Sequence, residues 1–422
     1  MESILRIIKK IIPRSIFGAL QPTYHYLFAL LAAFVYRFPS RKIKVVAITG
    51  TKGKTSTTEI VNAVLEEAGY RTALAGTLRF KIGDEEERNL YKMTIPGRFF
   101  VQRFLRRAVN AKCDWVIIEM TSEGARQFRH KFIDFDALLF TNLSPEHIES
   151  HGSFENYKEA KLSIVQALSN SHKRPRIIIA NADDQYANEF LAVDADTKTT
   201  YSLKDAEPYT LEKNKTIFNY QGAPLHAHLS GVFNLSNMLA GISFAQTIGI
   251  TPEVIRRALE KFNGIRGRVE RVNAGQDFDV IVDYAHTVDS LEKVYEVFQD
   301  ARKICVLGGT GGGRDSWKRP AMGAVAGAHC DEIILTNEDP YDEDPQKIVS
   351  EIMAGVPDAQ AEIIMDRREA IAHALTLAKT GDAVIITGKG TDPFIMEANG
   401  KKTPWDDATI AREELVKLGF KK

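Results

Sequence analysis

The chain has 422 residues, of which 44% are hydrophobic, enough apolar material to bury the cores of two or more domains. Lysine and arginine number 55, and aspartate and glutamate also number 55, so no net charge favours a nucleic acid or an acidic polymer as partner. The cysteines, Cys113, Cys305 and Cys330, lie far apart and match neither a metal-binding spacing nor a disulfide framework, which is typical of a reducing cytosol.

The first part of the chain is apolar and basic. Residues 1–14 mix isoleucine and leucine with lysine and arginine in the pattern of a basic amphipathic helix, and a second apolar stretch covers residues 24–38. The second stretch is shorter than the roughly 20 residues that span a bilayer, so no transmembrane helix is predicted. Nor does a small-residue cleavage site indicate a secretory signal. Two interpretations of residues 1–40 stay open: two helices packed on the protein body, or a peripheral membrane contact.

The stretch Lys44–Glu59 has the order of a strand, a glycine loop and a helix. Backbone N–H groups at such a helix start bind phosphate, a lysine reaches the outer phosphates, and a threonine hydroxyl ligates Mg²⁺. The long form of this motif has glycine where Ile48 stands, so the match is to the shorter form GTxGKT, and an ordinary strand, turn and helix stays the alternative. The predicted nucleotide-binding residues of the loop are Gly50, Thr51, Lys52, Gly53, Lys54 and Thr55.

Further along, residues 114–120 and 136–142 form two apolar runs that predict buried strands of a parallel sheet. Ligands collect at the carboxyl ends of such strands, where Glu119 lies. His147 follows the second run, so Glu119 and His147 are candidate ligands of Mg²⁺. His147 and His151 would also fit a solvated helix face or a zinc site, although two histidines alone are weak evidence for zinc.

Several motifs then follow one another in a recognisable order. They are Gly50–Thr55, Glu119 with Ser122, Phe140–Leu143 leading to Glu146, His147, His151 and Gly152, and Tyr157–Lys161. Together they resemble the Mur ligases, which are ATP-dependent amide-bond-forming enzymes of peptidoglycan synthesis. The type that looks closest is the UDP-N-acetylmuramoyl-tripeptide synthetase (MurE type), and the resemblance covers residues 43–415.

The resemblance implies a catalytic set for phosphoryl transfer. Its members are Lys54 and Thr55 on the phosphates and Mg²⁺, Glu119 and His147 as metal ligands, and Lys161, which would be carbamylated to support one of two Mg²⁺ ions. Without this resemblance, Lys161 would be interpreted as an ordinary exposed lysine on a helix. Asn234 and Asn237 would lie near the nucleotide, and Asn234 also fits a helix cap.

The same resemblance implies contacts to a muramoyl-peptide substrate. Thr94 and Pro96 match the family's TTP loop, with Ile95 in place of its second threonine. Ser122, with Arg126 or Arg129, would grip the sugar-peptide, but Glu123 stands where the MurE type usually has histidine. The predicted substrate-binding residues of this region are Thr94, Pro96, Ser122 and Arg129.

The sequence of residues 264–270 is typical of a hinge that contains glycine. After it, four apolar runs that predict strands alternate with helical stretches. This pattern predicts a second open parallel sheet, and residues 308–313 do not fit the GxGxxG motif of NAD binding. The resemblance assigns Arg268 to the ATP phosphates and Asp283 to the ribose. It thus implies that ATP is closed between two domains.

The incoming amino acid would meet a second set of residues. The resemblance makes Arg314 the partner of its carboxylate. Where enzymes for meso-diaminopimelate carry Asp-Asn-Pro-Arg, this chain has Glu338-Asp339-Pro340-Tyr341, so a bidentate arginine clamp is missing. The family's GKGHE appears as GKGTD and contains Lys389 and Asp392. The hypothesis is that Glu338, Asp339 and Asp392 suit an amine-bearing side chain such as lysine.

The predicted fold is α/β, with a short helical segment (1–40), a central P-loop ATPase domain with a parallel sheet (41–264) and a C-terminal Rossmann-like α/β domain (265–422). The predicted function is the ATP-dependent addition of an amino acid to a muramoyl-peptide-type acceptor by a cytoplasmic monomer. Full MurE-type enzymes carry an N-terminal domain for the UDP group, so the acceptor is left open between UDP-linked, lipid-linked and free forms. A folylpolyglutamate-synthase-like ligase and a non-catalytic ATP-binding scaffold are the alternatives.

Overall fold

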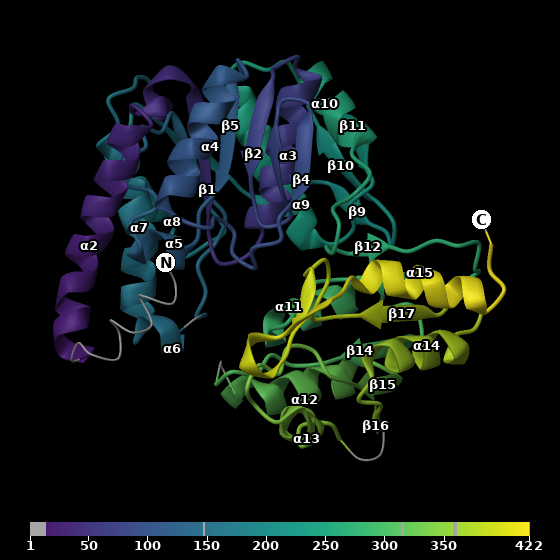
Figure 1. Ribbon diagram of the computed structural model, residues 1–422. Coiled ribbons are helices and arrows are strands. Elements are labelled where there is room, and N and C mark those ends of the chain that lie inside the picture. The colour runs from purple at the N-terminus through teal and green to yellow at the C-terminus, as the bar shows by residue number, and fades with distance from the viewer. Residues whose placement is uncertain (1–13, 147, 314–315, 358–360, 422) are drawn as a thin grey trace. The chain divides into compact units, whose positions relative to one another are not determined.

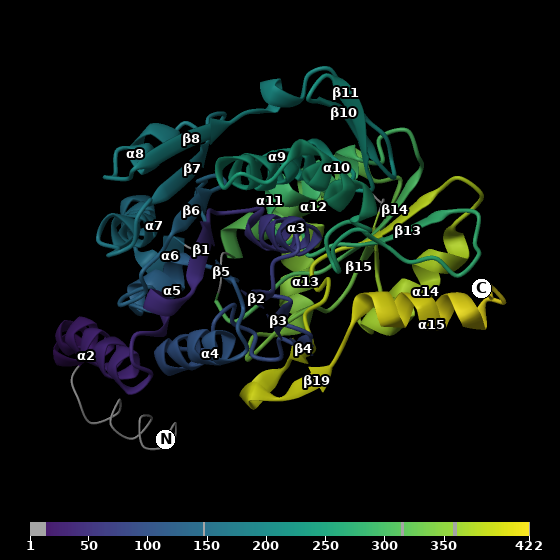
Figure 2. The same ribbon diagram turned by 90° about the horizontal axis from the view of Figure 1, so that it is seen from above.

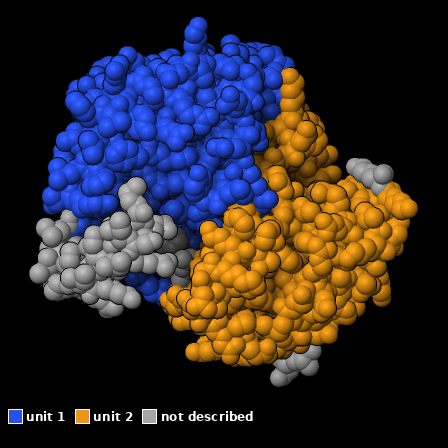
Figure 3. Space-filling model, in the orientation of Figure 1, with its two compact units in different colours: residues 1–206, 236–259 blue, residues 207–235, 260–422 orange. Residues whose placement is uncertain are grey.

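The computed structural model describes residues 14–146, 148–313, 316–357 and 361–421. Two compact units make up the chain (Figure 3). Unit 1 contains residues up to 206 together with 236–259, and unit 2 contains residues 207–235 together with 260–422. The domain boundaries expected at 41–264 and 265–422 stay predictions.

Unit 1 is built on an eight-stranded sheet with the order β4-β3-β2-β5-β1-β6-β7-β8. The strands are β1 (Lys44–Thr49), β2 (Thr72–Ala75), β3 (Arg79–Ile82), β4 (Glu85–Arg88), β5 (Trp115–Glu119), β6 (Ala137–Phe140), β7 (Ile177–Asn181) and β8 (Thr197–Tyr201). Strands β2 and β5 to β8 pair in parallel around β1, whereas β3 and β4 form an antiparallel edge. Because β1 lies in the middle of the sheet and helices pack on both sides of it, both its faces are buried, which explains its unbroken apolar run.

Helices cover both faces of this sheet. They are α2 (Arg14–Val35), η1 (Pro39–Lys42), α3 (Lys54–Glu67), α4 (Arg98–Asn110), α5 (Ser122–Arg126), α6 (Ile148–His151), α7 (Phe154–Ser169), α8 (Ala187–Leu191), η2 (Leu203–Ala206), α9 (Val232–Thr247) and α10 (Pro252–Lys261), of which α9 and α10 continue into unit 2. Helices α4 and α7 pack on the face that carries Val45 and Ala47, and α3 lies beside α9 over the other face (Figure 2). The strands predicted for residues 45–48, 114–120, 136–142 and 177–180 are confirmed.

The predicted N-terminal helices are only partly within the described residues. Residues 1–13 lie outside them, so the helix expected over 1–14 is left untested. Helix α2 covers most of the second apolar stretch, and it packs along α4 at the edge of unit 1 (Figure 1). Among the described residues, no helix combines the length and the apolar character that crossing a bilayer requires.

Unit 2 contains a six-stranded sheet with the order β12-β13-β17-β14-β15-β16. Its strands are β12 (Glu270–Arg271), β13 (Asp279–Val282), β14 (Lys303–Leu307), β15 (Glu332–Leu335), β16 (Ala361–Ile363) and β17 (Ala383–Ile386). All pair in parallel except β12, which pairs antiparallel with β13 at the edge. The four strands predicted in this half of the chain are therefore confirmed, as is the open parallel sheet.

The helices of unit 2 bury both faces of that sheet in two apolar clusters. They are α11 (Val288–Glu296), η3 (Ser316–Lys318), α12 (Arg319–His329), α13 (Pro345–Met353), α14 (Arg367–Leu377), η4 (Ala398–Gly400) and α15 (Asp407–Lys417). Helices α11, α12 and α13 cover one face, and α14 and α15 cover the other. Two small antiparallel sheets complete the unit: β9 (Tyr209–Leu211) with β10 (Thr216–Tyr220) and β11 (Ala223–Ala227), and β18 (Phe394–Met396) with β19 (Lys402–Pro404).

The cysteines correct one expectation. Cys305 in β14 and Cys330 at the end of α12 form a disulfide, with their Cα atoms 6.1 Å apart. The prediction that the cysteines form no disulfide framework is therefore wrong for this pair. Helix α12 packs on the sheet and ends beside β14, which brings together two residues that lie 25 positions apart in the chain. Cys113 is free and buried.

Candidate active site

The loop between β1 and α3 has a backbone that only glycine accommodates at two positions. Gly50 has φ +151° and Gly53 has φ +79°. A Cβ atom at Gly50 would lie 1.9 Å from Thr141 Oγ1, and one at Gly53 would lie 2.3 Å from Asn237 Oδ1. The loop is therefore fitted closely against the end of β6 and against α9, and its glycines allow that approach.

The end of β6 holds the loop by hydrogen bonds. Asn142 O accepts from the Thr51 N–H (2.8 Å), and Asn142 Oδ1 accepts from the Lys52 N–H (2.9 Å). Thr141 Oγ1 donates to Lys52 O (2.7 Å), and the Thr51 hydroxyl lies 2.9 Å from the hydroxyl of Tyr157. Thr141, Asn142 and Tyr157 were not among the predicted site residues, although Thr141 and Asn142 end the predicted strand 136–142 and Tyr157 begins the motif Tyr157–Lys161.

Helix α3 begins directly at Lys54. Its N-cap is Gly53, which has no side chain to bind the first N–H groups, whereas Ser153 caps α7 by accepting from the Asn156 N–H. The Lys54 ammonium donates to the carbonyl oxygens of Gly50 (2.9 Å) and Thr51 (2.7 Å). The loop thus combines a helix N-terminus with a cation over the same backbone, which suits a bound phosphate.

Glu119, at the end of β5, connects Thr55 of the glycine-loop motif with Thr77. Glu119 Oε1 accepts from Thr55 Oγ1 (3.0 Å), and Glu119 Oε2 accepts from the Thr77 N–H (2.9 Å). The hydroxyls of Thr77 and Thr94 lie 3.0 Å apart, so the predicted substrate residue Thr94 is linked to Glu119 through one residue. Carboxylate and hydroxyl oxygens are the ligands that Mg²⁺ prefers, so Glu119 and Thr55 fit that ion.

Lys161, in the middle of α7, is fully buried with 1% of its surface exposed. Its ammonium donates to Gly50 O (2.6 Å), the carbonyl that Lys54 also binds, and lies 4.8 Å from the centre of the Tyr157 ring. Burial and the nearby charge of Lys54 hold the pKa of Lys161 well below its usual value. The alternative of an exposed helical lysine is therefore wrong: α7 turns Lys161 towards the loop.

The segment after β6 brings a second pair together. His151 is buried, and its Nε2 lies 3.1 Å from the hydroxyl of Ser122, a predicted substrate residue. His147, the expected metal ligand, lies outside the described residues. In the part of the chain that the structure describes, no group of three or more histidine, cysteine, aspartate or glutamate residues could hold a metal ion, so the zinc alternative gains no support there.

Arg129 holds the loop that carries Thr94 and Pro96. Its guanidinium donates to Ile95 O and to Gln127 Oε1 (2.7 Å). Burial lowers the pKa of Arg129 to about 10, with a smaller effect from neighbouring charges. The structure therefore brings Arg129 into contact with the loop that carries Thr94 and Pro96, although the two segments are separate in the sequence.

The two asparagines of α9 fall in different units. Asn237, in unit 1, accepts from Thr57 Oγ1 through its Oδ1 at 3.4 Å and lies close to Gly53. Asn234, in unit 2, is fully buried, and its side-chain amide donates to Ser230 O (2.8 Å). Because α9 begins at Val232, Asn234 lies inside the helix rather than before it, and the predicted helix cap at Asn234 is wrong.

Asp283 and Arg268, the residues predicted for ATP in unit 2, lie at one end of β13. Asp283 accepts from the N–H groups of Val269 (2.6 Å) and Ala285 (2.7 Å). Burial raises the pKa of Asp283 above its usual value, against the opposing effect of Arg268. Arg268 donates to Gly267 O (2.9 Å), and its guanidinium lies 4.7 Å from the centre of the Tyr284 ring.

Lys389 occupies the centre of the predicted amino-acid site. Its ammonium is fully buried and contacts Asp339 Oδ1 (2.9 Å), Asp392 Oδ2 (3.1 Å) and Phe394 O (2.6 Å). The acidic cluster expected from the sequence therefore already contains an internal cation. Lys389 pairs with two carboxylates of this cluster, those of Asp339 and Asp392. Asp392 lies only three residues after Lys389 on the same loop.

Glu338 is the third carboxylate of that cluster. Its Oε1 accepts from Thr310 Oγ1 (2.9 Å), while its Oε2 is buried without a hydrogen bond among the described residues. Burial raises the pKa of Glu338. Arg314, the residue expected to bind the carboxylate of the incoming amino acid, lies outside the described residues.

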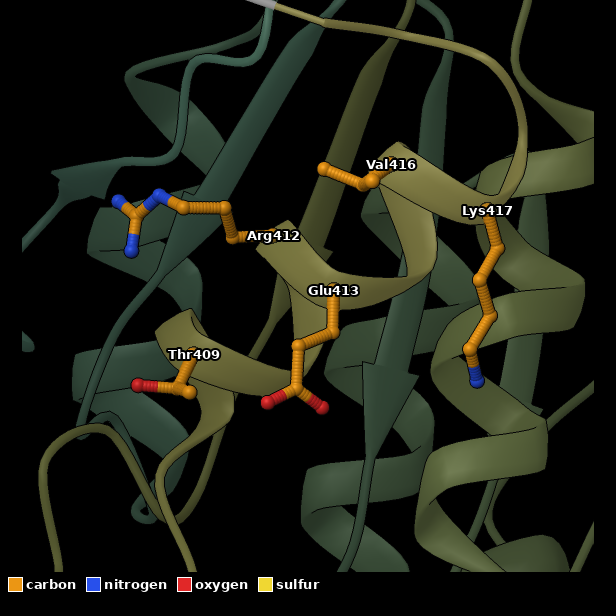
Figure 4. A pocket seen from close by; sticks show the side chains of 5 residues that line it. All are labelled: Thr409, Arg412, Glu413, Val416 and Lys417. Carbon is orange, nitrogen blue, oxygen red and sulfur yellow. The ribbon is translucent and has the colours of Figure 1, made fainter.

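Two surface hollows of unit 2 contain none of these residues. One lies between residues 211–214, the start of α9 and α11. The other lies along one helix, α15, and side chains of that helix alone line it (Figure 4). The candidate site is therefore defined by the strand ends and the glycine loop, not by the hollows.

A glycine loop at the carboxyl edge of a parallel sheet, with a buried lysine and a carboxylate beside it, defines a P-loop nucleotide-binding protein of the α/β class. Comparison with protein families narrows the class. The Mur ligase middle domain matches residues 48–245, and the family described as Mur ligase, glutamate ligase domain matches residues 267–390. The chain belongs to the Mur ligase family, whose members are ATP-dependent amide ligases that use Mg²⁺.

Individual relatives agree with this assignment. The chain is 39% identical, over 92% of its length and 81% of the relative's, to the UDP-N-acetylmuramoyl-L-alanyl-D-glutamate--2,6-diaminopimelate ligase of Syntrophomonas wolfei. A solved structure of a ligase with that name is 27% identical, with a TM-score of 0.61 over 89% of this chain and 79% of that one. The folylpolyglutamate synthase of Mycobacterium tuberculosis has a TM-score of 0.69 over 92% and 94% of the two chains, but at 15% identity it shares the fold alone.

Proposed function

We propose that this ligase adds an amino acid to a muramoyl-peptide-type acceptor in peptidoglycan synthesis. The observation that carries the proposal is the meeting of Lys54, Lys161 and the pair Thr55–Glu119 at one glycine loop. The relatives that the chain resembles over most of its length are named for this reaction, with 2,6-diaminopimelate as the amino acid. A folylpolyglutamate-synthase-like activity has only a shared fold in its favour.

The reaction has two steps. A carboxylate oxygen of the acceptor attacks the γ-phosphorus of ATP, the bond from that phosphorus to the β–γ bridging oxygen breaks, and ADP leaves. The amine of the amino acid then attacks the carbonyl carbon of the acyl phosphate. The bond to phosphate breaks, the amine loses a proton, and an amide and inorganic phosphate result.

The glycine loop would serve the first step. The backbone N–H groups at the start of α3 and the ammonium of Lys54 would hold the phosphates, and Lys54 would stabilise the negative charge on the phosphoryl group in transfer. Thr55, Glu119 and the predicted ligand His147 would hold Mg²⁺. When bound, Mg²⁺ supplies positive charge that the ATP oxygens share during transfer.

Lys161 is proposed to carry a carbamate that supports a second Mg²⁺. The amine must be unprotonated to attack CO₂, and burial beside Lys54 lowers the pKa of Lys161 in that direction. The nitrogen forms a bond to the CO₂ carbon and loses one proton, so a neutral amine becomes a carbamate anion. The change replaces a group that would be a cation when protonated by an anion that attracts Mg²⁺.

The remaining predicted residues would bind the substrates. Thr94, Pro96, Ser122 and Arg129 are proposed for the muramoyl peptide, Arg268, Asp283, Asn234 and Asn237 for ATP, and Arg314, Glu338, Asp339, Lys389 and Asp392 for the amino acid. Contacts already link Thr94 to Glu119 and Arg129 to the backbone of Ile95. Lys389 would act by fixing Asp339 and Asp392 rather than by contacting the substrate.

We infer that the amino acid carries a second amine, with lysine as the candidate. Tyr341 stands where enzymes for meso-diaminopimelate have arginine, so a carboxylate on the side chain would lack its clamp. Glu338 Oε2 is buried and has no hydrogen bond within the described residues, so it could accept one from an amine. We also propose that the protein works as a monomer in the cytoplasm, the compartment that supplies ATP and Mg²⁺.

Phosphate release from ATP tests the proposal. The protein is incubated with Mg²⁺, ATP, UDP-N-acetylmuramoyl-dipeptide and one amino acid at a time, including lysine and meso-diaminopimelate. We expect turnover that depends on the amino acid and a product whose mass equals acceptor plus amino acid minus water. Lys54→Ala should lower turnover about 100-fold or more, because it removes a charge aimed at the transferring phosphoryl group.

Lys158→Ala is the matched control, because Lys158 is a surface lysine of the same unit that pairs with Glu189. Its turnover should equal that of the unchanged protein. Absence of turnover with every amino acid would refute the UDP-linked acceptor, and turnover with a folate and glutamate instead would establish the folylpolyglutamate alternative. A preference for meso-diaminopimelate over lysine would refute the inference about the amino acid alone.

A further inference from the structure

Helix α2 exposes its large apolar side chains and buries its small ones. Between residues 21 and 35, the only buried side chains are those of Ala29, Ala32 and Ala33, which face the body of unit 1. The exposed apolar side chains of the helix are Tyr24, Tyr26, Leu27, Phe28, Leu30, Leu31, Phe34 and Val35, and Phe34 has 71% of its surface exposed. A helix that only packs on a protein body shows the opposite arrangement.

The exposed side chains form one continuous face. Leu27, Leu31 and Phe34 follow each other at helical spacing, with Tyr24 and Phe28 beside them. The stretch from residue 21 to 35 contains no lysine, arginine, aspartate or glutamate. The small alanines let α2 approach α4 closely, and α2 runs along the edge of unit 1 (Figure 1, Figure 2). The large side chains of α2 are therefore left exposed to solvent.

Contacts with α4 and its neighbours fix the orientation of this face. His25 and Arg98 are hydrogen-bonded, the rings of Phe28 and Phe99 are 6.3 Å apart, and Arg106 donates to Tyr36 O (2.7 Å). The second half of α2 therefore runs beside α4, so the exposed face of α2 is held in place by several contacts. Its outward apolar surface is a fixed feature of unit 1.

Cations border the apolar face. On α4, Phe99, Arg103 and Arg107 lie at intervals of four residues, and all three are exposed. Arg37 follows α2 and is also exposed. Within the described residues, Arg37 and Arg103 form no ion pair, whereas Arg107 pairs with Glu85 and Arg41 with Asp134.

Carboxylates are absent from the two chain segments that build this surface. Residues 3–58 contain no aspartate or glutamate, and neither do residues 89–113, although the whole chain has equal numbers of acidic and basic residues. Residues 3–58 also include Arg6, Lys9, Lys10 and Arg14, which precede the exposed face in the sequence. The surface therefore combines large apolar side chains with positive charge, and both match an anionic bilayer surface.

We propose that the exposed face of α2, with the bordering arginines of α4, docks unit 1 on an anionic phospholipid bilayer, lying in the membrane interface without crossing it. Tyr24, Phe28 and Phe34 would enter the headgroup region, and Arg37 and Arg103 would contact lipid phosphates. A helix that buries alanines against α4 on one side can offer lipid only its other side, which is why it lies flat.

A second copy of the chain is a less suitable occupant of this face. Two copies meeting through this face would bring Arg37 and Arg103 of both copies together, with no carboxylate in the same segments to neutralise them. An isolated exposed apolar residue elsewhere lacks these features. Val416 on α15 has 48% of its surface exposed but lies among Arg412, Glu413 and Lys417 (Figure 4).

Vesicle flotation with the full chain tests the proposal. The protein is mixed with vesicles of phosphatidylcholine that contain phosphatidylglycerol, and with vesicles of phosphatidylcholine alone, at low and high salt. We expect the floated fraction to be larger with phosphatidylglycerol and to fall as salt rises. The double variant Leu31→Glu/Phe34→Glu should reduce binding about tenfold or more, since it puts two charges into the apolar face.

Val416→Glu/Leu418→Glu is the matched control, because these two residues are also exposed and apolar but lie in unit 2. It should float like the unchanged protein. Arg37→Gln/Arg103→Gln should weaken binding and flatten its dependence on salt. Thermal unfolding and the sedimentation coefficient of each variant report whether it is folded and monomeric.

Three results would overturn the proposal. The unchanged protein could fail to float with phosphatidylglycerol vesicles, or the variant of Leu31 and Phe34 could float as well as the control, which would assign binding to another segment. A dimer in vesicle-free solution that the Leu31 and Phe34 variant converts to a monomer would assign the face to contact between copies instead.

Discussion

Lys161 in unit 1 and Lys389 in unit 2 are both buried lysines, yet their surroundings differ. The described contacts of the Lys161 ammonium are the carbonyl of Gly50 and the ring of Tyr157, and its pKa lies well below the usual value. The Lys389 ammonium contacts the carboxylates of Asp339 and Asp392. The surroundings of Lys161 thus favour a neutral amine, whereas Lys389 lies in an ion pair with two carboxylates.

Two further buried groups, one in each unit, show the same contrast. His130 in unit 1 is fully buried with no hydrogen bond to either ring nitrogen among the described residues, and burial lowers its pKa to about 3. In unit 2, Arg367 donates to both oxygens of Asp407 at 2.9 and 2.7 Å. Burial lowers the pKa of Arg367, but Asp407, with Glu338 and Asp339, outweighs that effect and the pKa ends above its usual value.

The two buried lysines are suited to different roles, one to a chemical reaction and the other to holding the structure. A buried amine that is neutral can react with CO₂ or change charge when a ligand binds, whereas a paired ammonium is fixed by its carboxylates. The glycine loop therefore lies beside the group whose charge can change. The paired groups of unit 2 hold the loops around the proposed amino-acid site.

The largest expected effect comes from breaking a buried pair in unit 2. Arg367→Met leaves the buried Asp407 without its cation and should lower the free energy of unfolding by about 3–5 kcal/mol in urea titrations. Arg368→Met is the matched control, since Arg368 is a partly exposed neighbour on α14 that pairs with Glu413 and Glu414. Its cost should stay below about 1 kcal/mol.

The double variant Arg367→Met/Asp407→Leu removes both charges. It should recover part of the stability that the single variant loses, because no buried charge then stays uncompensated. Equal costs for Arg367→Met and Arg368→Met would show that the buried pair in unit 2 is no stronger than a surface pair, and the comparison between the units would fail.

Variants of Lys161 test the comparison in unit 1. Lys161→Ala should lower ATP-dependent ligase turnover about 100-fold, as expected when a group that orients a metal site is removed. Lys161→Glu keeps a carboxylate near the position of the proposed carbamate and should recover part of the loss. Removing bicarbonate from the buffer should slow the unchanged protein but leave Lys161→Glu unaffected.

Lys158→Met serves as control, because Lys158 lies on the same helix but pairs with Glu189 at the surface. It should keep its turnover and its dependence on bicarbonate. If turnover of the unchanged protein does not depend on bicarbonate, and Lys161→Glu is as slow as Lys161→Ala, the carbamate is refuted.

The smallest expected effect concerns pH. The pKa of His130 is about 3 in the folded protein and about 6.5 in the unfolded chain, so below pH 6.5 the unfolded state binds the proton and gains stability. Folding stability should therefore fall with pH in the window between 6.5 and 3. The contribution of His130 to that fall amounts to about 2 kcal/mol at pH 5.

His130→Leu has a similar volume and no proton to gain. Urea titrations between pH 7 and 5 should show a smaller loss of stability on acidification for this variant than for the unchanged protein. Parallel pH profiles would mean that His130 titrates normally, and that unit 1 does not keep this buried group neutral.

Local sequence was sufficient for the frame of both sheets. The run Val45–Ile48 followed by glycines and Lys54 predicted β1, the loop and α3, because β-branched residues and glycine act through the backbone of neighbouring residues. Four parallel strands of unit 2 followed from their apolar runs. Strands such as β2 to β4 and β9 to β11 were not predicted, since they are short and their pairing partners decide them.

The sequence by itself determined the glycine loop, the two parallel sheets and the membership of a ligase family, because periodicity and motif order are properties of adjacent residues. Only the tertiary structure decided that Lys161 reaches Gly50, that Lys389 neutralises Asp339, that Cys305 meets Cys330, and that α2 turns its alanines inward. These features depend on strand order and helix rotation, which bring together residues far apart in the chain. Burial then sets the charge of each group that they enclose.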